Sequence, residues 1–459
     1  MTERLSALDV SFVYAEDQST SLHVGELLVF DDPDGGLTHD TLARLVLDRL
    51  PAVPRFRQRV RGVPGNVARP VWVDDASFDV EYHVRRSAVP RPGTDEQVND
   101  LVGRIMSRAL DRAHPLWEMY LVEGLAEGRL AILTKTHPAL VGEGAFNLGQ
   151  LLFDDPGADA RAAAAEWRPP REPSSVELLA GGVVDVLRTP GAVVDAVRAG
   201  VGDVQRAASK ALSVAGGLLE TARVVARPGA AGVLGAPVGD ARRFATRATD
   251  LEVYRALRVA HGVTVNDIVL TVVTGALRSW LLSRGEPIGT GDTVSALVPV
   301  GVMGAGDTFV SVTPFVVELP VGEPQAVVRL QQVSYAMRGH AESGQAVGAR
   351  AIAGLAVFAP PTVHAWGARV VGSLSRRAFG LVVTNVPGPQ SPRYVAGALM
   401  TSAYPVVPLG PHQPVSVGVT SYLGQVCYGV TADRDAVPDI EVLAQCLDDA
   451  LAELIGATP

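Results

Sequence analysis

Two stretches in which short strands alternate with helices, separated by a segment without any strand pattern, constrain the fold of this chain most. The first stretch runs from residue 1 to about residue 154. Short apolar runs typical of strands and amphipathic runs typical of helices follow one another there. We expect strands at 22–30, 67–73, 119–123 and 131–136, and helices at 41–50 and 95–109. The stretch is therefore predicted to be a mixed α/β domain, at 1–155.

The alternation resumes at about residue 242 and continues to the C-terminus. Thr264, with Asp267 three residues later, is a capping box that predicts the start of a helix ending before Gly285. A second α/β domain is therefore predicted at 239–459. Its strands are expected at 293–299, 310–319, 379–384, 415–422 and 425–431, the last two as a hairpin, and its closing helix from about 438.

The segment 156–238 between the two domains is rich in Ala, Gly and Val and has no strand signal. Ser174 with Glu177 marks a helix start, and valines between 193 and 204 form an apolar helical stripe. We interpret the segment as a pair of amphipathic helices that cross from one domain to the other. Alternatively, such a helical surface with few charges would rest on lipid, although Lys and aromatic anchors are scarce.

Charge and the chain's apolar runs exclude several kinds of protein. The net charge of −9 and the lack of a basic run argue against nucleic-acid binding. No basic region followed by an apolar core occurs at the N-terminus, and no run of about 18 apolar residues occurs anywhere. We therefore expect a cytoplasmic protein, at most peripheral to a membrane or to lipid inclusions. Cys427 and Cys446 are expected to be buried thiols rather than a disulfide or a metal pair.

The segment 130–147 has the pattern of a buried strand followed by an active-site loop, and it reads LAILTKTHPALVGEGAFN. The apolar run ends at His137, and Gly142 and Gly144 punctuate the loop that follows. An imidazole at the end of a strand is suited to proton transfer, because its pKa lies near neutrality. The next residue, Pro138, cannot accept a proton.

Further blocks of sequence resemble the same protein family as this segment does. They are LSALDVSFVYAE at 5–16 with HVG at 23–25, DRAHPLWEMYLVEGL at 111–125, VTVNDIVLTVVTGALR at 263–278, SGQAVGA at 343–349, TNVPGP at 384–389 and SYLGQVCYGVTADRDAVPD at 421–439. In this order they resemble the wax ester synthase/diacylglycerol acyltransferase family of the CoA-dependent acyltransferase superfamily. The resemblance covers nearly the full chain apart from the middle segment.

The resemblance implies two chloramphenicol acetyltransferase-like α/β domains with a tunnel between them. Acyl-CoA would enter on one side as substrate or ligand, and a lipid hydroxyl acceptor, either diacylglycerol or a fatty alcohol, on the other. The product would be triacylglycerol or wax ester, and no metal or bound cofactor is implied. Residues of the blocks that would line the tunnel or hold the fold are Pro115, Leu116, Trp117, Asn266, Asp267, Asn385, Pro387 and Gly388. Helix capping, turns and domain packing explain the same residues structurally.

The family's HHxxxDG signature is incomplete in this chain. His137 takes the place of the first His, and Pro138 that of the second, which in the family is the general base. Without a gap, Gly142 replaces the Asp and Glu143 the Gly. With one residue deleted, the alignment that we prefer, the Asp is missing and Gly142 keeps the place of the Gly. On either alignment the base and the Asp that braces the loop are absent.

Three other groups could supply the base. His137 would serve if its ring were reoriented, Glu143 is a weaker candidate because a desolvated carboxylate can act as a base, and His114 is a third. His23 and His83 are expected to be ordinary strand residues. Two hypotheses stay open: O-acyl transfer with a lost or relocated base, or a catalytically inactive relative that binds acyl-CoA, lipid or a partner acyltransferase.

No rival chemistry has a motif in the sequence, since GxSxG, GxxxxGK[ST], HExxH and CxxC are all missing. One basic cluster remains to be explained. We interpret it as a solvated or salt-bridged face, with a site for the phosphates of CoA as the alternative. It consists of Arg55, Arg57, Arg59 and Arg61.

Overall fold

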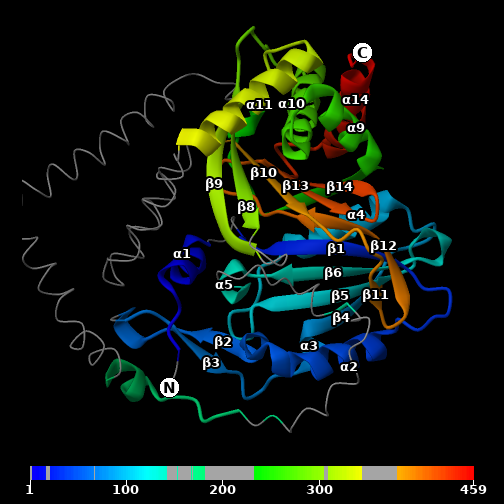
Figure 1. Ribbon diagram of the computed structural model, residues 1–459. Helices are drawn as coiled ribbons and strands as arrows, with labels where there is room; N and C mark the ends of the chain where they lie inside the picture. The colour runs from blue at the N-terminus through cyan, green and yellow to red at the C-terminus, as the bar shows by residue number, and fades with distance from the viewer. Residues whose placement is uncertain are drawn as a thin grey trace, which may run out of the picture.

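Two six-stranded sheets with helices packed on them form most of the described chain (Figure 1). A small two-stranded sheet accompanies them. The α/β alternation expected from the sequence is therefore confirmed. The computed structural model describes residues 3–16, 21–66, 68–141, 152–153, 167, 169–180, 232–303, 309–343 and 380–458.

The N-terminal sheet holds the motif strand in its interior. Its strand order is β11-β12-β1-β6-β5-β4, and β6 is hydrogen-bonded in antiparallel register to β1 and β5. All of β6 beyond its first residue is buried, which explains the apolar run. The strands are β1 Val24–Asp31, β4 Val84–Ala88, β5 Trp117–Glu123, β6 Leu130–Thr136, β11 Tyr394–Val395 and β12 Ala398–Val406.

Helices pack on both faces of this sheet. α4 begins at a capping box between Thr94 and Gln97 and packs against the face that carries Leu27. α1 and α2 pack against the opposite face, around Leu28 and Phe30. The helices are α1 Ala7–Ala15, α2 His39–Arg49, α3 Val80–His83, α4 Asp95–Met106 and α5 Pro138–Val141, with 3-10 turns at Leu50–Ala52, Pro54–Arg57, Pro64–Asn66 and Ala126–Gly128.

The C-terminal sheet has the strand order β7-β14-β13-β10-β8-β9, and the helices above it in Figure 1 share its core. α10 begins at the predicted capping box between Thr264 and Asp267. The strands are β7 Arg242–Asp250, β8 Val294–Met303, β9 Phe309–Leu319, β10 Leu381–Pro387, β13 Val415–Tyr422 and β14 Gln425–Asp433. The helices are α9 Leu251–His261, α10 Val265–Ser283, α11 Ala326–Ser343 and α14 Ile440–Gly456, and a 3-10 turn lies at Val233–Gly235.

Among the described helices, only α10 is long and apolar enough to cross a membrane. Its most apolar window is 72% buried inside the protein. It packs against α11 and α14 and contributes Ile268, Val272 and Trp280 to the core. These contacts are those of a core helix.

β12 comes from the C-terminal part of the chain but belongs to the N-terminal sheet, where its orange ribbon lies beside the blue β1 in Figure 1. It also packs across β13 and β14. A Cβ atom added at Gly418 would lie 2.7 Å from Cβ of Pro405, and one at Gly429 would lie 2.0 Å from the Pro405 carbonyl oxygen. Only glycine allows this approach. The predicted second domain at 239–459 is thus wrong for β11 and β12, because main-chain pairing places both in the first sheet.

The small sheet pairs β2 Gln58–Arg61 with β3 Val71–Asp74. The strand predicted at 67–73 is therefore wrong at its start, because it begins only at Val71. In the middle segment, the predicted capping box is confirmed by the bond from the Glu177 N–H to the Ser174 Oγ at 3.3 Å. The predicted valine stripe lies outside the described residues.

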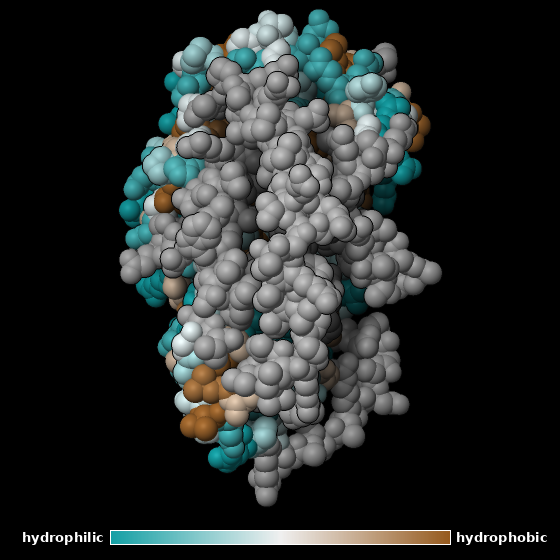
Figure 2. Space-filling view, turned by 90° about the vertical axis from the view of Figure 1, so that its left-hand side faces the viewer, coloured by the Kyte–Doolittle hydropathy of each residue, from teal (hydrophilic) through white to brown (hydrophobic). Residues whose placement is uncertain are grey.

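On the face shown in Figure 2, the described surface is mostly hydrophilic, and its apolar residues occur in small separate groups. Scattered apolar residues of this kind are normal on a protein surface. The described part of this face therefore has no extended apolar patch of the kind that marks a docking site.

Candidate active site

The motif strand β6 leads directly into the short helix α5. The N–H of His137 donates to the Leu116 carbonyl at 3.0 Å, and the N–H of Leu140 donates to the His137 carbonyl at 2.9 Å. Pro138 is the first residue of α5. A proline suits this position, because the missing N–H is not needed there and the fixed φ is helical. The proline is thus compatible with the local fold.

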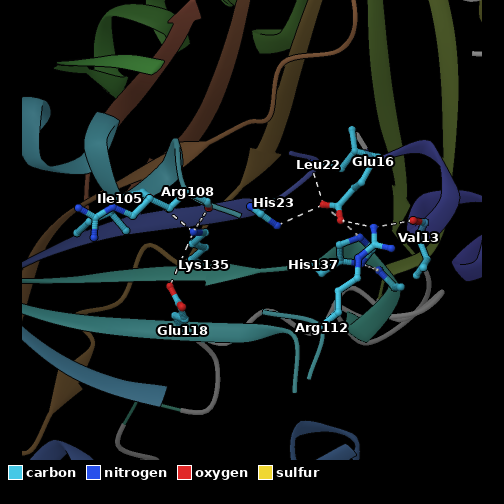
Figure 3. Close-up of polar contacts among 11 residues, drawn as sticks. Val13, Glu16, Leu22, His23, Ile105, Arg108, Arg112, Glu118, Lys135 and His137 are labelled. Carbon is cyan, nitrogen blue, oxygen red and sulfur yellow. Dashed lines mark hydrogen bonds and ion pairs between the residues drawn. The ribbon is translucent and has the colours of Figure 1, made fainter. Parts of the chain in front are cut away.

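The carboxylate of Glu16 contacts several segments of chain around the end of β6 (Figure 3). Oε1 of Glu16 accepts the N–H of Leu22 at 3.1 Å and lies 3.2 Å from Nε2 of His23 and 3.4 Å from Nε2 of His137. Oε2 accepts a hydrogen bond from Nη2 of Arg112 at 3.0 Å. The two imidazole nitrogens do not meet hydrogen-bond geometry. Their contacts with Glu16 are therefore close electrostatic ones.

Burial and these contacts set the charges in the cluster. Burial alone would raise the pKa of the Glu16 carboxyl, but His137 and His23 hold that pKa well below its usual range. Burial lowers the pKa of His23, although the Glu16 carboxylate opposes this shift. Arg112, whose side chain is half-exposed, supplies the balancing positive charge.

Both ring nitrogens of His137 face protein groups. Nδ1 accepts the N–H of Ala139 at 3.1 Å, which places the ring proton on Nε2, the nitrogen that faces Glu16. The residue is 1% exposed. A base role would require the ring to leave both partners. In the described conformation, His137 has the contacts of a structural histidine.

The structure describes one of the two other proposed bases, His114. Glu143 lies outside the described residues, as do Gly142 and Gly144. Nδ1 of His114 lies 3.5 Å from Oδ2 of Asp75.

The expectation that His23 and His83 are ordinary strand residues is wrong. His23 precedes β1 and belongs to the Glu16 cluster. His83 ends α3, where its ring stacks on those of Phe78 and Trp117, with centroid distances of 5.1 and 4.4 Å. Burial lowers the pKa of His83 to about 4. Both roles depend on contacts that form only in the folded chain, which periodicity does not reveal.

Lys135 of the motif strand β6 is a fully buried cation (Figure 3). Its Nζ donates to the carbonyls of Ile105, at 3.0 Å, and of Arg108, at the C-terminal end of α4. It also lies 3.8 Å from Oε2 of Glu118. Burial lowers the pKa of Lys135 to about 8, although Glu118 partly opposes this shift. The lysine thus fixes the end of α4 to the motif strand.

Two of the predicted blocks meet at the C-terminal sheet. The side-chain amide of Asn385 donates to Oδ1 of Asn266 at 3.2 Å. Asp267 accepts the N–H of Thr264 at 2.9 Å and so caps α10. At Gly388, an added Cβ would lie 2.3 Å from the Ser421 carbonyl oxygen.

Pro387 is the last residue of β10, opposite Ser421. The predicted residues Pro115, Leu116 and Trp117 are buried where β5 begins. The indole N–H of Trp117 donates to the Phe56 carbonyl at 2.8 Å. These contacts are packing contacts within the described part of the chain.

The arginine cluster is salt-bridged or buried. Three of its members pair with carboxylates, and Arg57 lies against the ring of Trp167, 4.9 Å from the centroid. The pairs are Arg55 with Glu3, Arg59 with Glu172 and Arg61 with Glu172. The salt-bridged interpretation is therefore confirmed for Arg55, Arg59 and Arg61, whereas Arg57 is buried.

Within the described residues, neither a disulfide nor a metal site is present. Cys427 and Cys446 are free and buried, as expected. Burial raises the pKa of Cys427 to about 11. No group of three or more His, Cys, Asp or Glu side chains suited to a metal occurs in the described ranges.

Glu26 is a titratable group that the sequence analysis missed. It lies on β1 between Thr134 of β6 and Pro405 of β12, and its N–H donates to Oγ1 of Thr134 at 3.1 Å. The residue is only partly buried, yet burial raises its pKa to about 7. It also interacts electrostatically with Cys427 of β14. Glu26 therefore faces the junction of the two sheets.

We expect Glu26 to make the folded state less stable as the pH rises from about 4.5 to about 7. The folded state favours the neutral acid, so ionisation of Glu26 costs up to roughly 3 kcal/mol above pH 7 and nothing below pH 4.5. Glu26→Gln should therefore be more stable than the wild type at pH 8, and this gain should shrink at pH 5. Urea unfolding at both pH values measures it, with the exposed Glu81→Gln as control. An equal gain at both pH values would contradict the prediction.

Comparisons with known proteins support one family. Residues 5–269 match the family model described as the wax ester synthase/diacylglycerol acyltransferase catalytic domain, and residues 311–455 match the model of its C-terminal domain. The chain belongs to this wax ester synthase/diacylglycerol acyltransferase family. The resemblance seen in the motif blocks is thereby confirmed.

Relatives of the family match over most of the chain. A probable diacylglycerol O-acyltransferase of Mycobacterium tuberculosis is 32% identical over 458 residues, which cover 98% of this chain and 96% of the relative. Another from this species is 41% identical over 263 residues, 57% of this chain and 97% of the relative. The solved wax ester synthase/diacylglycerol acyltransferase of Marinobacter aquaeolei VT8 superposes with a TM-score of 0.69 at 25% identity and 99% coverage of both chains.

The fold extends beyond the family. A condensation domain of rhizomide synthetase, solved with C8-CoA and Leu-SNAC, superposes with a TM-score of 0.54 at 14% identity, covering 100% of this chain and 95% of its own. At this identity the match shows the fold alone. It confirms the expected architecture of CoA-dependent acyltransferases.

Proposed function

We propose that this protein transfers an acyl group from acyl-CoA to the hydroxyl of diacylglycerol or of a long-chain alcohol. The observation that carries the proposal is the nearly full-length match to relatives named as diacylglycerol O-acyltransferases. In this reaction the hydroxyl oxygen attacks the thioester carbonyl, an ester C–O bond forms and the C–S bond breaks. CoA leaves as a thiol with the proton that the hydroxyl has lost.

The proton must leave the hydroxyl without help from residue 138. A general base contributes about 10² to 10⁴ in rate, and the Pro138 ring offers no lone pair for this purpose. His137 supports the reaction in this proposal by holding α5 through its bond with Ala139. The protein is therefore a slow acyltransferase.

The acceptors in this proposal are lipids, so the protein would meet them at a membrane or a lipid inclusion from the cytoplasm. The support is chemical, because diacylglycerol and long-chain alcohols partition into lipid. The valine stripe predicted at 193–204 is the candidate contact.

A second candidate function is the binding of acyl-CoA without turnover. It is favoured by one observation, the Pro at position 138, whereas the names of the relatives favour acyl transfer.

The test is an assay of the purified protein with labelled palmitoyl-CoA and either dioleoylglycerol or hexadecanol in sedimentable vesicles. We expect ester above the protein-free rate, protein in the vesicle pellet, and a rate at least about tenfold lower for His137→Ala, because α5 loses its anchor. Ester at the protein-free rate together with palmitoyl-CoA binding would support the second candidate. Protein that stays in the supernatant would overturn the lipid-surface proposal.

A further inference from the structure

Four separate segments of chain meet at the carboxylate of Glu16. They are the end of α1, the entry into β1 at Leu22, the segment before β5 through Arg112, and the end of β6 at His137. Figure 3 shows the side chains of Arg112 and His137 pointing toward the Glu16 carboxylate, which the backbone N–H of Leu22 also contacts. The carboxylate thus lies where the motif strand gives way to α5.

Arg112 ties α1 into this arrangement twice. Its Nη2 donates both to Oε2 of Glu16, at 3.0 Å, and to the carbonyl of Val13, at 2.8 Å. α1 itself packs against α5. The N-terminal helix is therefore attached to the motif through polar contacts as well as through its apolar side chains.

The contacts form a chain from Glu16 to the backbone of α5. The negative oxygen of Glu16 faces the protonated Nε2 of His137, which leaves Nδ1 as the acceptor for the N–H of Ala139. This bond and the Leu140 N–H to His137 carbonyl bond set the direction of α5. Without a negative charge beside Nε2, the ring could turn over or change tautomer, and the bond to Ala139 would be lost.

We propose that Glu16 is a positioning residue for acyl transfer, bracing the start of α5 from the N-terminal helix in a chain whose motif lacks the bracing Asp. The kinetic part of the proposal rests on the proposed function. Glu16 acts through His137 and touches no reacting atom. The end of α1 is thereby part of the site.

The experiment compares Glu16→Gln, which keeps the size and removes the charge, with Glu16→Asp, which keeps the charge on a shorter stem. Glu127→Gln is the matched control, because the Glu127 side chain is 83% exposed. The readouts are kcat and KM with palmitoyl-CoA and dioleoylglycerol, and hydrogen exchange of the Ala139 and Leu140 amides. Exchange of the β13 amides reports whether the whole protein remains folded.

For Glu16→Gln we expect a kcat at least about tenfold lower with KM unchanged, and amide exchange at Ala139 and Leu140 at least about tenfold faster with β13 unaffected. Glu16→Asp should recover part of the lost kcat and part of the protection of these two amides from exchange. Wild-type exchange at these amides in Glu16→Gln overturns the proposal. Faster exchange everywhere, including β13, also overturns it, since Glu16 would then serve global stability. If wild-type turnover is absent, the proposed function fails, and the exchange data still decide the role of Glu16.

Discussion

Pro138→His is expected to raise the rate of acyl transfer by about 10² or more. The substitution places an imidazole at the position that holds the general base in the family, and such a base contributes about 10² to 10⁴ in rate. His is compatible with the first turn of α5, since this position does not require proline. Initial rates of ester formation from palmitoyl-CoA and dioleoylglycerol measure the effect.

Pro138→Ala is the matched control for this gain, because it removes the ring without supplying a base. Equal rates for the Ala and His variants would contradict the prediction and would mean that the site no longer aligns the substrates. The activity of Pro138→His should also rise with pH through the pKa of the new imidazole, near 6.5, since only the neutral ring accepts a proton.

Lys135→Met is expected to lower the free energy of unfolding by about 3 kcal/mol. Met keeps most of the volume of the side chain but leaves the buried carbonyls of Ile105 and Arg108 without their charged donor. Each unsatisfied buried group costs about 1–3 kcal/mol, and the relief of the desolvated ammonium offsets part of this. Urea-induced unfolding at pH 7 measures the change.

Arg86→Met is the control for the loss of a positive charge, because Arg86 pairs with Glu123 on the surface. Water screens an exposed pair of this kind, so it contributes little to stability. If Lys135→Met is as stable as the control, the contacts of Lys135 with α4 do not stabilise the fold.

The elements that were predictable from sequence are those with a local signal. β6 is a continuous apolar run, and α10 begins with a capping box, so both were placed closely. β7 was missed because Arg and Thr occupy much of its sequence. β12 was missed because Pro405 interrupts its pattern, and a proline argues against an interior strand.

The site was predictable only in part, for a physical reason. The motif pointed to His137 and Pro138, but the group that faces Nε2 of His137 is Glu16, more than a hundred residues away in sequence. Glu26 gave no signal either, because its pKa depends on the environment at the junction of the sheets. The residues that a group contacts in the folded protein determine its role, and a single sequence does not show which residues those are.

The placement of β12 has a consequence for synthesis of the chain. Until residues 398–406 emerge from the ribosome, β1 presents an unpaired edge of main-chain donors and acceptors. The first sheet therefore cannot be completed before residues 398–406 are synthesised. Until then, the free edge of β1 must avoid pairing with strands of other chains. Synthesis has to reach Val406 before the first sheet has all its strands, and Asp433 before the second sheet has all of its own.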